Sequence, residues 1–416
     1  MQKVIDLEEK KMHSKLLHMF EEAHEDNQKI LSTLFAIKNE HPFWDCSSQR
    51  KVGVTELRNK EVIFFISHPV IQLEQFLLIV QQLQNHPNNK PENLYEIVWI
   101  PIANCIPWSE VEEVSFNNII DIWPWSSVYK PSLLSFSVLK FIREVWHFHD
   151  DPVMVVLDSK GRVISLNAID MVVIWGDLAY PFSIIREREL WEGESWTFGI
   201  LLNGIDPLLS YWIEDGRTIL LYGSHDIGWV REFTNKVKVI EEAGLSLELI
   251  YIGSNNLEQS KEVLATVTTE RLSRYLSHIK ICIFWLRLES IRKSKSRLGF
   301  PFETDVIMRE ATSLCSLDVE NKGFLLISEG ARNEILRLSG MEVSECLSLF
   351  HVWGQKVNKF GFLGAVRKHL DASPSIDHCS YYSIFPYVEN MDERSIACKN
   401  CGGPLKKHYL YQCVGS

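Results

Sequence analysis

The first forty residues alternate charged and apolar positions at helical spacing. The apolar positions are Leu7, Leu16, Met19, Phe20, Ile30, Leu31, Leu34 and Phe35. Apolar residues three or four positions apart form one face of an α-helix, so this pattern predicts one or two amphipathic helices. The polar stretch at residues 41–51 predicts a loop, and residues 85–91 (NHPNNKP) predict a surface loop built from turn-forming residues.

From residue 60 onward, short continuous apolar runs alternate with amphipathic segments, as expected for buried strands and covering helices. Strands are predicted at residues 62–66, 97–100, 153–157 and 162–165. Helices are predicted at residues 73–83, 133–146 and 167–177, the last capped by Asn167. The order β-α-β-α-β-β-α is that of a thioredoxin-like core.

A second α/β pattern follows and repeats the strand–helix–strand theme. Strands are predicted at residues 218–221, 247–252 and 324–327, and helices at residues 229–240, ended by Gly244, and 307–315. Residues 281–288 fit either a strand or a helix. We therefore expect an α/β protein with a thioredoxin-like central domain and a second α/β domain, for which a second thioredoxin-like unit is one reading. The predicted segments are residues 1–50 (helical), 51–190 (thioredoxin-like), 191–370 (second α/β domain) and 371–416 (Cys-containing tail).

The end of the first predicted strand decides whether the thioredoxin-like domain has redox chemistry. The segments IVWIP, WPWSSV and DPVMVVLDSKGRV resemble the tryparedoxin and nucleoredoxin branch, in which Pro152 would be the cis-proline beside the active site. A working redoxin carries Cys-x-x-Cys at the strand end, but this chain reads Ser67-His68-Pro69-Val70-Ile71. Because thiol–disulfide exchange needs an attacking thiolate, we predict a redox-inactive domain. We interpret His68 as a capping or surface residue rather than a replacement catalyst.

Composition and charge narrow the class of protein. Hydrophobic residues make up 46% and charged residues 23%, which excludes a disordered chain and a disulfide miniprotein. The formal charge is 43 − 54 = −11, which argues against non-specific nucleic-acid binding. No apolar run reaches the roughly 18 residues of a membrane helix, and the N-terminus lacks the apolar core of a signal peptide. We therefore expect a cytoplasmic protein without a membrane span.

Two further motifs have ordinary structural interpretations. The turn at residues 222–226 lies between a strand and a helix, where backbone amides can hold an anion, but a plain turn is favoured because the phosphate-loop spacing is missing. The basic run at residues 292–297 (RKSKSR) is interpreted as a solvated loop or helix end, with contact to an acidic surface, including the chain's own, as the alternative. No segment has the ligand spacing of an EF-hand loop.

The C-terminal cysteines are the sharpest local feature. Cys398 and Cys401 form a C-x-x-C pair, with Cys379 upstream and Cys413 downstream. Two thiolates on one tight turn suit a tetrahedral ion, so we hypothesise a structural zinc site with Cys379, Cys398, Cys401 and Cys413 as ligands. The alternatives are a redox-labile pair or unliganded cysteines. Catalytic triads, paired carboxylates and dinucleotide-binding signatures are not found at the required spacing, so no catalytic or cofactor-binding residue is predicted.

Several ordered segments carry a resemblance to one known family. They are YEIVWIPI (95–102), PWSSVYKPSLL (124–134), FIREVWHF (141–148), VVLDSKGRV (155–163), NAIDMVVIWG (167–176), ILLYGSHDIGWVREFTNKV (219–237), LELIYIG (247–253), FWLRLESIRKSK (284–295) and the closing CKNCGGPLKKHYLYQC. Together they resemble the plant sieve element occlusion proteins, the family of phloem P-proteins and forisome subunits. The resemblance covers nearly the whole chain.

The resemblance implies a noncatalytic structural protein of the sieve-element cytoplasm. Such proteins assemble with themselves and related subunits into filaments or bodies, occlude sieve plates after wounding and, in some legume members, respond to calcium. It also implies a longer N-terminal helical domain than the roughly fifty residues here, and paired terminal cysteines where this chain ends in Cys413-Val414-Gly415-Ser416. The alternatives are a redoxin-derived thiol oxidoreductase using Cys398 and Cys401, and a module that binds a ligand in the groove near Pro152.

Overall fold

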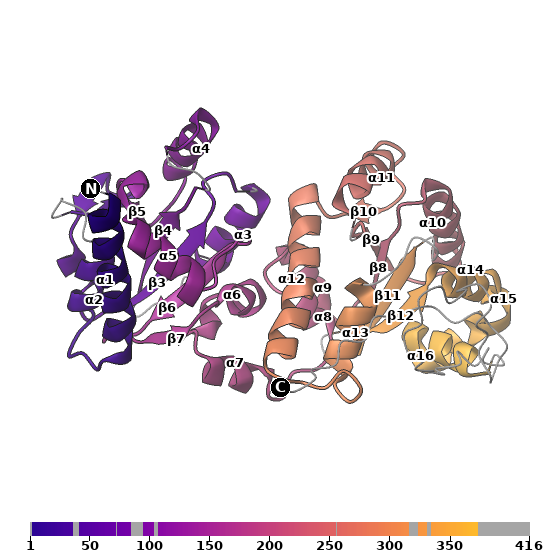
Figure 1. Ribbon diagram of the computed structural model, residues 1–416. Helices are drawn as coiled ribbons and strands as arrows, with labels where there is room; N and C mark the ends of the chain where they lie inside the picture. Colours follow the sequence, from indigo (N-terminus) through magenta and orange to yellow (C-terminus); the bar gives the residue numbers. More distant parts are fainter. Residues whose placement is uncertain are drawn as a thin grey trace, which may run out of the picture. The chain divides into compact units, whose positions relative to one another are not determined.

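The computed structural model describes most of the chain in two compact units, residues 1–348 and 349–416. The described residues are 2–35, 41–71, 73–84, 95–103, 107–254, 256–315, 323–330 and 334–372. The first unit contains two β-sheets flanked by helices (Figure 1). The described part of the second unit is helical. The predicted loop at residues 85–91 lies outside the described residues.

The first sheet has seven strands in the order β2-β1-β5-β4-β3-β6-β7. Its strands are β1 (Phe43–Asp45), β2 (Arg50–Val52), β3 (Glu61–Ser67), β4 (Tyr95–Pro101), β5 (Ser126–Val128), β6 (Val153–Leu157) and β7 (Val163–Ser165). Its helices are α1 (Gln2–Glu21), α2 (Gln28–Leu34), α3 (Leu73–Gln84), α4 (Glu110–Ile120), α5 (Phe136–Val145) and α6 (Ile169–Trp175). β3 pairs with β4 in parallel and with β6 in antiparallel register, and β6 pairs with β7. This is the predicted thioredoxin-like core.

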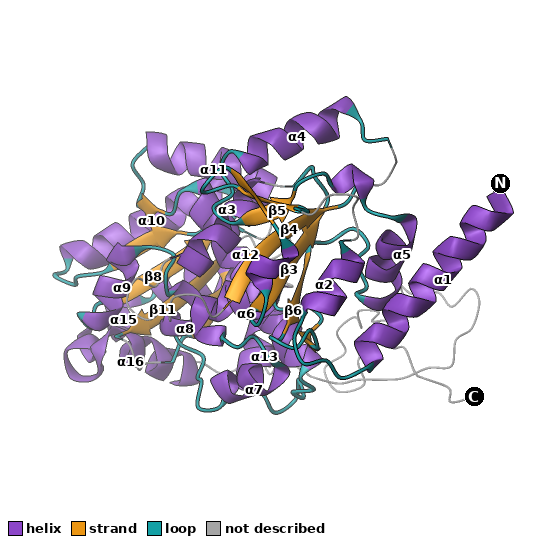
Figure 2. Cartoon of the chain, turned by 90° about the vertical axis from the view of Figure 1, so that its left-hand side faces the viewer, coloured by secondary structure: helices purple, strands orange, loops and turns teal. Residues whose placement is uncertain are grey.

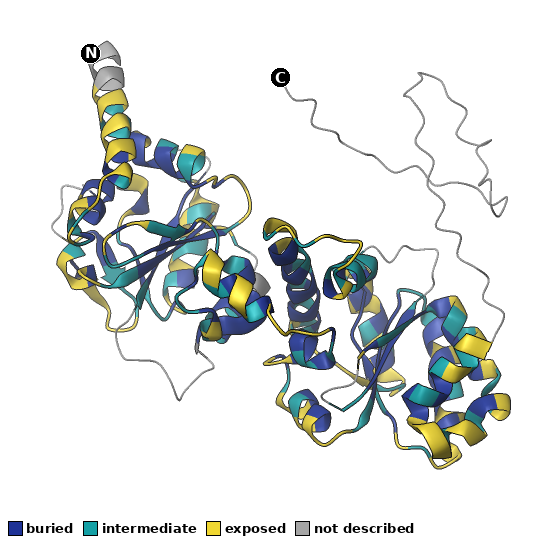
Figure 3. Cartoon of the chain, turned by 90° about the horizontal axis from the view of Figure 1, so that it is seen from below, coloured by how far each residue is buried: buried dark blue, intermediate teal, exposed yellow. Residues whose placement is uncertain are grey.

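The two N-terminal helices pack on this sheet through the predicted apolar positions. Leu16 and Met19 of α1 and Ile30 and Leu31 of α2 are buried in the same core as Phe64 of β3. In Figure 3 the strands and the inner faces of the helices are buried, while the outer helix faces are exposed. The N-terminal segment is therefore an integral layer over the sheet, as its amphipathic pattern indicates.

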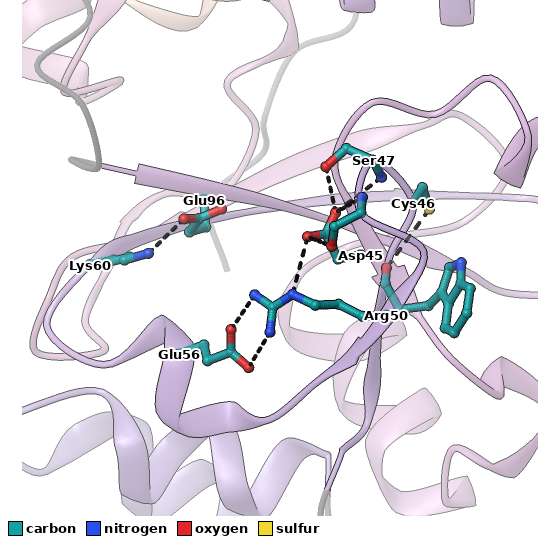
Figure 4. Close-up of polar contacts among 9 residues, drawn as sticks. Asp45, Cys46, Ser47, Arg50, Glu56, Lys60 and Glu96 are labelled. Atoms are coloured by element: carbon teal, nitrogen blue, oxygen red, sulfur yellow. Dashed lines mark hydrogen bonds and ion pairs between the residues drawn. The ribbon is translucent and has the colours of Figure 1, made fainter.

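The polar stretch predicted as a loop instead forms the β1–β2 hairpin. The Asp45 carboxylate accepts a hydrogen bond from the backbone amide of Ser47 (Figure 4) and another from the amide of Ser48, and these bonds close the turn. After the turn, Arg50 pairs with Glu56 at 2.7 Å. β1 also pairs with β5, a strand more than 80 residues away by sequence number, so the hairpin depends on a partner that local patterning does not reveal.

The structure also adds a helix and a strand between β4 and α5 that the sequence pattern missed. They are α4 and β5. The Ser109 side chain accepts a hydrogen bond from the Glu112 backbone amide, and the Glu112 carboxylate accepts one from the Ser109 backbone amide. This reciprocal pair is a capping box. Ser-x-x-Glu before an apolar residue was the sequence signal that could have found this helix.

The second sheet repeats the order of the first. Its strands are β8 (Thr218–Gly223), β9 (Glu248–Tyr251), β10 (Arg274–Tyr275), β11 (Phe324–Glu329) and β12 (Leu336–Ser339). The order is β10-β9-β8-β11-β12, with β8 parallel to β9 and antiparallel to β11. β8 and β11 are labelled side by side in Figure 2. The strand order β9-β8-β11-β12 therefore matches β4-β3-β6-β7, and the corresponding strands pair in the same parallel or antiparallel sense. The second domain has the thioredoxin-like strand arrangement that was one of its predicted readings.

Helices cover this second sheet and connect it to the first. They are η3 (Gly176–Ala179), α7 (Ile184–Trp191), α8 (Phe198–Leu202), α9 (Pro207–Glu214), α10 (Ile227–Glu242), α11 (Leu257–Thr269), α12 (His278–Arg297), α13 (Val306–Cys315) and α14 (Gly340–Ser348). The ambiguous residues 281–288 lie within α12. This helix has apolar residues around much of its circumference because it packs against α6 and α3 of the first sheet and against α13. A helix buried on several sides loses the one-sided pattern that identifies an amphipathic helix.

The second unit contains a helical pair in its described part, α15 (Phe350–Trp353) and α16 (Val357–Ala372). Trp353 is fully buried and contacts Phe350 and Phe362. Gly361 has φ 71° and interrupts the helical backbone of α16. Among the described residues of the whole chain, no helix is long and apolar enough to cross a membrane. The predicted domain boundaries stay predictions.

The partly buried Glu61 at the start of β3 should make the stability of the protein depend on pH. Burial raises the pKa of Glu61 to about 7, and the Tyr180 hydroxyl, which is hydrogen-bonded to it, only partly offsets this effect. A carboxyl group whose folded pKa is raised contributes most stability at low pH, and this contribution is lost as the pH rises through about 7. We predict that Glu61→Gln raises the free energy of unfolding at pH 8 by on the order of 1 kcal/mol and has little effect near pH 5. Urea unfolding at both pH values checks this, and an equal effect at both would contradict it.

Candidate functional site

The end of β3 is the position where a redoxin carries its reactive thiol, and here it carries Ser67 and His68. The buried Ser67 hydroxyl accepts a hydrogen bond from Trp99 Nε1 at 3.0 Å and donates to the His68 carbonyl at 2.9 Å. A serine hydroxyl that is buried and already hydrogen-bonded on both sides is a structural group. No base within these contacts could activate it as a nucleophile.

His68 is also held in place. Its Nδ1 donates to the Ile102 carbonyl at 2.9 Å, its ring contacts Phe148, and its Nε2 lies 3.9 Å from a carboxylate oxygen of the exposed Asp150. These contacts agree with a structural histidine. The prediction that Pro152 is a cis-proline is wrong. Among the described residues, the cis peptide bond is Tyr180–Pro181. Pro152 directly precedes β6.

The end of β8 is the equivalent position in the second sheet, and it too has no thiol. The Asp226 side chain accepts hydrogen bonds from the amides of Gly228 and Trp229 and caps α10. The amides that could have held an anion are therefore already occupied, in agreement with a plain turn. Gly223 is required here because a Cβ atom would lie 1.7 Å from the Gly253 carbonyl oxygen.

Three of the four described cysteines do not supply a thiolate elsewhere. Burial raises the pKa of Cys46, Cys315 and Cys346 to about 12 in each case. A thiol with so high a pKa is almost fully protonated at neutral pH and is a poor nucleophile. The proposed zinc ligands Cys379, Cys398, Cys401 and Cys413 lie outside the described residues. Within the described part, no group of three His, Cys, Asp or Glu side chains is arranged to hold a metal ion.

A pocket of about 560 Å³ lies beside Pro152, where a redoxin would receive its substrate. One wall comes from the segment before β6 and the start of α6, including His149, Asp150 and Asn167. The other wall is the face of α12 that carries Ser290 and Lys293. The second sheet's longest helix therefore forms one side of the groove next to the first sheet.

The basic run at residues 292–297 forms the last turns of α12, so the predicted helix end is confirmed. Its side chains are mostly paired with the chain's own acids, so the prediction that they are only solvated is wrong. Arg297 contacts Asp170 at 2.7 Å and Glu187 at 2.6 Å, and Glu187 is fully buried. Lys295 is buried against Asp305 at 2.6 Å. These contacts join α12 to α6 and α7, and the alternative of contact with an acidic surface of the same chain is confirmed.

Sequence reasoning also missed Arg287, in the middle of α12. Its side chain is buried and has no carboxylate partner among the described residues. Instead, the guanidinium donates hydrogen bonds to the carbonyls of Val173, Leu201 and Asn203. Burial lowers the pKa of Arg287 to about 10, so the side chain remains charged at neutral pH. A single arginine within the apolar run IFWLRL was the available signal.

Two repeated sheets, each without a thiol at its redox position, define a thioredoxin-like α/β protein that lacks the redoxin active site. The family profile for the sieve element occlusion C-terminus matches residues 185–415. The chain belongs to the sieve element occlusion family.

Individual relatives extend this match over nearly the whole chain. Sieve element occlusion C of Arabidopsis thaliana is 32% identical over 97% of this chain and 58% of the relative. Sieve element occlusion B of the same plant is 31% identical over 96% of this chain and 56% of the relative. The chain thus spans about half the length of the curated relatives it matches. Among solved structures, tryparedoxin from Trypanosoma brucei is 15% identical, covers 37% of this chain and 98% of its own, and has a TM-score of 0.29.

The Arg297 contacts generate a prediction with a matched control on the same helix. Arg297→Met leaves the buried Glu187 and Asp170 carboxylates without their cation, so we expect it to lower the free energy of unfolding by about 3 kcal/mol. Arg292 is equally exposed, at 35%, but its partner Glu289 is itself 33% exposed. Arg292→Met should therefore cost less than about 1 kcal/mol. Equal losses in urea unfolding would show that partner burial does not set the cost.

Proposed function

We propose that this chain is a noncatalytic structural subunit of phloem sieve elements. It assembles with further copies and related subunits into filaments or bodies in the cytoplasm, and these help to occlude sieve plates after wounding. The proposal that the subunit is noncatalytic rests on the end of β3. There a hydrogen-bonded Ser67 occupies the position at which a redoxin has its reactive cysteine. Membership of the sieve element occlusion family supports the structural role and the location.

The fold is consistent with this role because buried side chains of α12 join the two sheets of the first unit into one folded body, whose surface can contact a second copy. When a head-to-tail contact between two different surfaces does not close into a ring, it repeats and builds a filament. A subunit of this kind needs no catalytic centre.

Calcium is proposed as a regulator of this assembly. The formal charge of −11 makes copies repel one another at low ionic strength. A divalent cation that binds surface carboxylates reduces this repulsion and favours the assembled state. The proposal rests on charge and family and assigns no calcium site.

The pocket beside Pro152 supports a second candidate function, a groove-binding module. It lies at the redoxin substrate position and combines the exposed His149 and Asp150 with Lys293 of α12. A polar segment of a partner protein is the kind of ligand that this lining would accept. The other alternative is a thiol oxidoreductase that uses Cys398 and Cys401.

The assembly proposal predicts particles much larger than a monomer in the purified protein. We expect light scattering to show them and negative-stain microscopy to identify them as filaments or bodies. Calcium should change their size and a chelator should reverse the change. A monodisperse monomer under all conditions would contradict self-assembly, and particles indifferent to calcium and chelator would contradict only the regulatory part.

The tail cysteines allow one variant to test two proposals. We also propose that Cys379, Cys398, Cys401 and Cys413 hold a structural zinc ion, so the wild-type chain should contain about one zinc per chain and Cys398→Ser/Cys401→Ser none. In an insulin-reduction assay with dithiothreitol, both proteins should show only the background rate. A wild-type rate well above background that the double substitution abolishes would favour the oxidoreductase alternative.

A further inference from the structure

Helix α4 presents apolar side chains to solvent. Val111 is 68% exposed and Val114 is 53% exposed, and their spacing of three places them on one side of the helix. The opposite side is anchored by Ile119, which is buried, and by Phe116, which contacts Trp99 and Trp108. In Figure 1 this helix stands at the top of the view, clear of the other labelled helices. Its outer face has no covering element among the described residues.

The same helix is strongly acidic. Residues 107–129 contain four acidic residues, Glu110, Glu112, Glu113 and Asp121, and no lysine or arginine. Glu110 and Glu113 are exposed and form no ion pair among the described residues. Glu112, by contrast, is used in the capping box. We refer to Glu110, Val111, Glu113 and Val114 as the α4 patch.

A surface of complementary character lies on the second unit. Residues 349–372 contain four basic residues, Lys356, Lys359, Arg367 and Lys368, and one acidic residue, Asp371. Lys359 and Lys368 flank the partly exposed Phe360, with their ammonium groups 5.2 and 4.4 Å from its ring centroid. Within the described part of the chain neither ammonium has a carboxylate partner. We refer to Lys359, Phe360 and Lys368 as the α16 patch.

We propose that the α4 patch of one copy binds the α16 patch of a second copy. This inference rests on the proposed function and names the contact through which the chain self-associates. Each patch combines an exposed apolar group with two charges of one sign, and the two signs are opposite. Burying the valines against the Phe360 ring removes apolar surface from water, while the glutamates approach the two ammonium groups.

The charge of the whole chain favours this choice of partner surface. At a formal charge of −11, most pairs of surfaces from two copies repel each other. Residues 349–372 carry a formal charge of 4 − 1 = +3 and are therefore a place where an acidic helix is attracted. Because the two patches are different surfaces, the contact is head-to-tail and leaves one patch of each kind open at the ends of every oligomer.

Charge reversal tests the contact. The acid-reversed chain carries Glu110→Lys and Glu113→Lys, and the base-reversed chain carries Lys359→Glu and Lys368→Glu. Each replaces two attractions by two repulsions, so we expect the protein concentration needed for assembly to rise roughly tenfold or more in each variant alone. High salt should weaken assembly of the wild-type chain for the same reason.

Mixing the two variants is the experiment that decides whether the two patches bind each other. In an equimolar mixture the reversed α4 patch of one variant meets the reversed α16 patch of the other, and the unreversed patches also meet with opposite charge. Assembly should therefore return toward the wild-type concentration dependence in the mixture. If each variant alone fails and the mixture fails too, the patches do not bind between copies and the proposal is overturned.

Matched controls separate this contact from net charge and from misfolding. Glu241→Lys/Glu242→Lys on α10 makes the same charge change as the acid-reversed chain at two other exposed positions, and it should leave assembly no weaker than in the wild type. Val111→Ser/Val114→Ser keeps every charge and should also weaken assembly. Thermal unfolding and circular dichroism identify any variant that does not fold.

The outcomes distinguish this inference from the function on which it rests. If the wild-type chain assembles and both reversed variants assemble equally well, the contact is wrong while the structural function stands. If the wild-type chain does not assemble at any concentration, both are overturned for this chain. Loss in each variant with recovery in the mixture supports both.

Discussion

The buried guanidinium of Arg287 is the constraint on which the arrangement of the first unit depends. It donates to carbonyls near the C-terminal ends of α6 and α8, where unpaired carbonyl groups carry partial negative charge. α6 belongs to the first sheet and α12 to the second. Removing the guanidinium while the helices stay packed would leave the carbonyls of Val173 and Leu201 without this donor, which is costly in a low-dielectric interior. Arg297 pairs with the buried Asp170 and Glu187 at the C-terminal end of the same helix.

Both sheets keep the redoxin strand arrangement without its reactive thiol. In both sheets the strand end that would hold a reactive thiol is filled by ordinary structural contacts, through Ser67 in one case and the Asp226 cap in the other. Thiol exchange requires an open, electropositive position at a helix start. Filling that position with hydrogen bonds removes the reactivity and keeps the connection between strand and helix.

The sequence predicted those parts of the fold that depend on local patterning. β3 and β6 were found because continuous apolar runs are typical of strands buried on both faces, and α10 because Gly244 marks its end. β1 was missed because it depends on pairing with the distant β5, and α12 was ambiguous because it is buried on several sides. The partners of Arg287 and Arg297 could not be predicted, since contacts between residues about 80 to 130 positions apart leave no mark in a single sequence.

The same distinction between local and global properties governs association. Charges farther apart than about 10 Å are largely screened at 0.1 M salt, so two copies in contact respond to the charges of the touching surfaces more than to the total. An acidic chain can therefore associate where a basic segment such as residues 349–372 interrupts its surface. Each such contact is weak, because exposed ion pairs contribute little individually. Association through contacts of this kind is therefore sensitive both to the protein concentration and to the salt concentration.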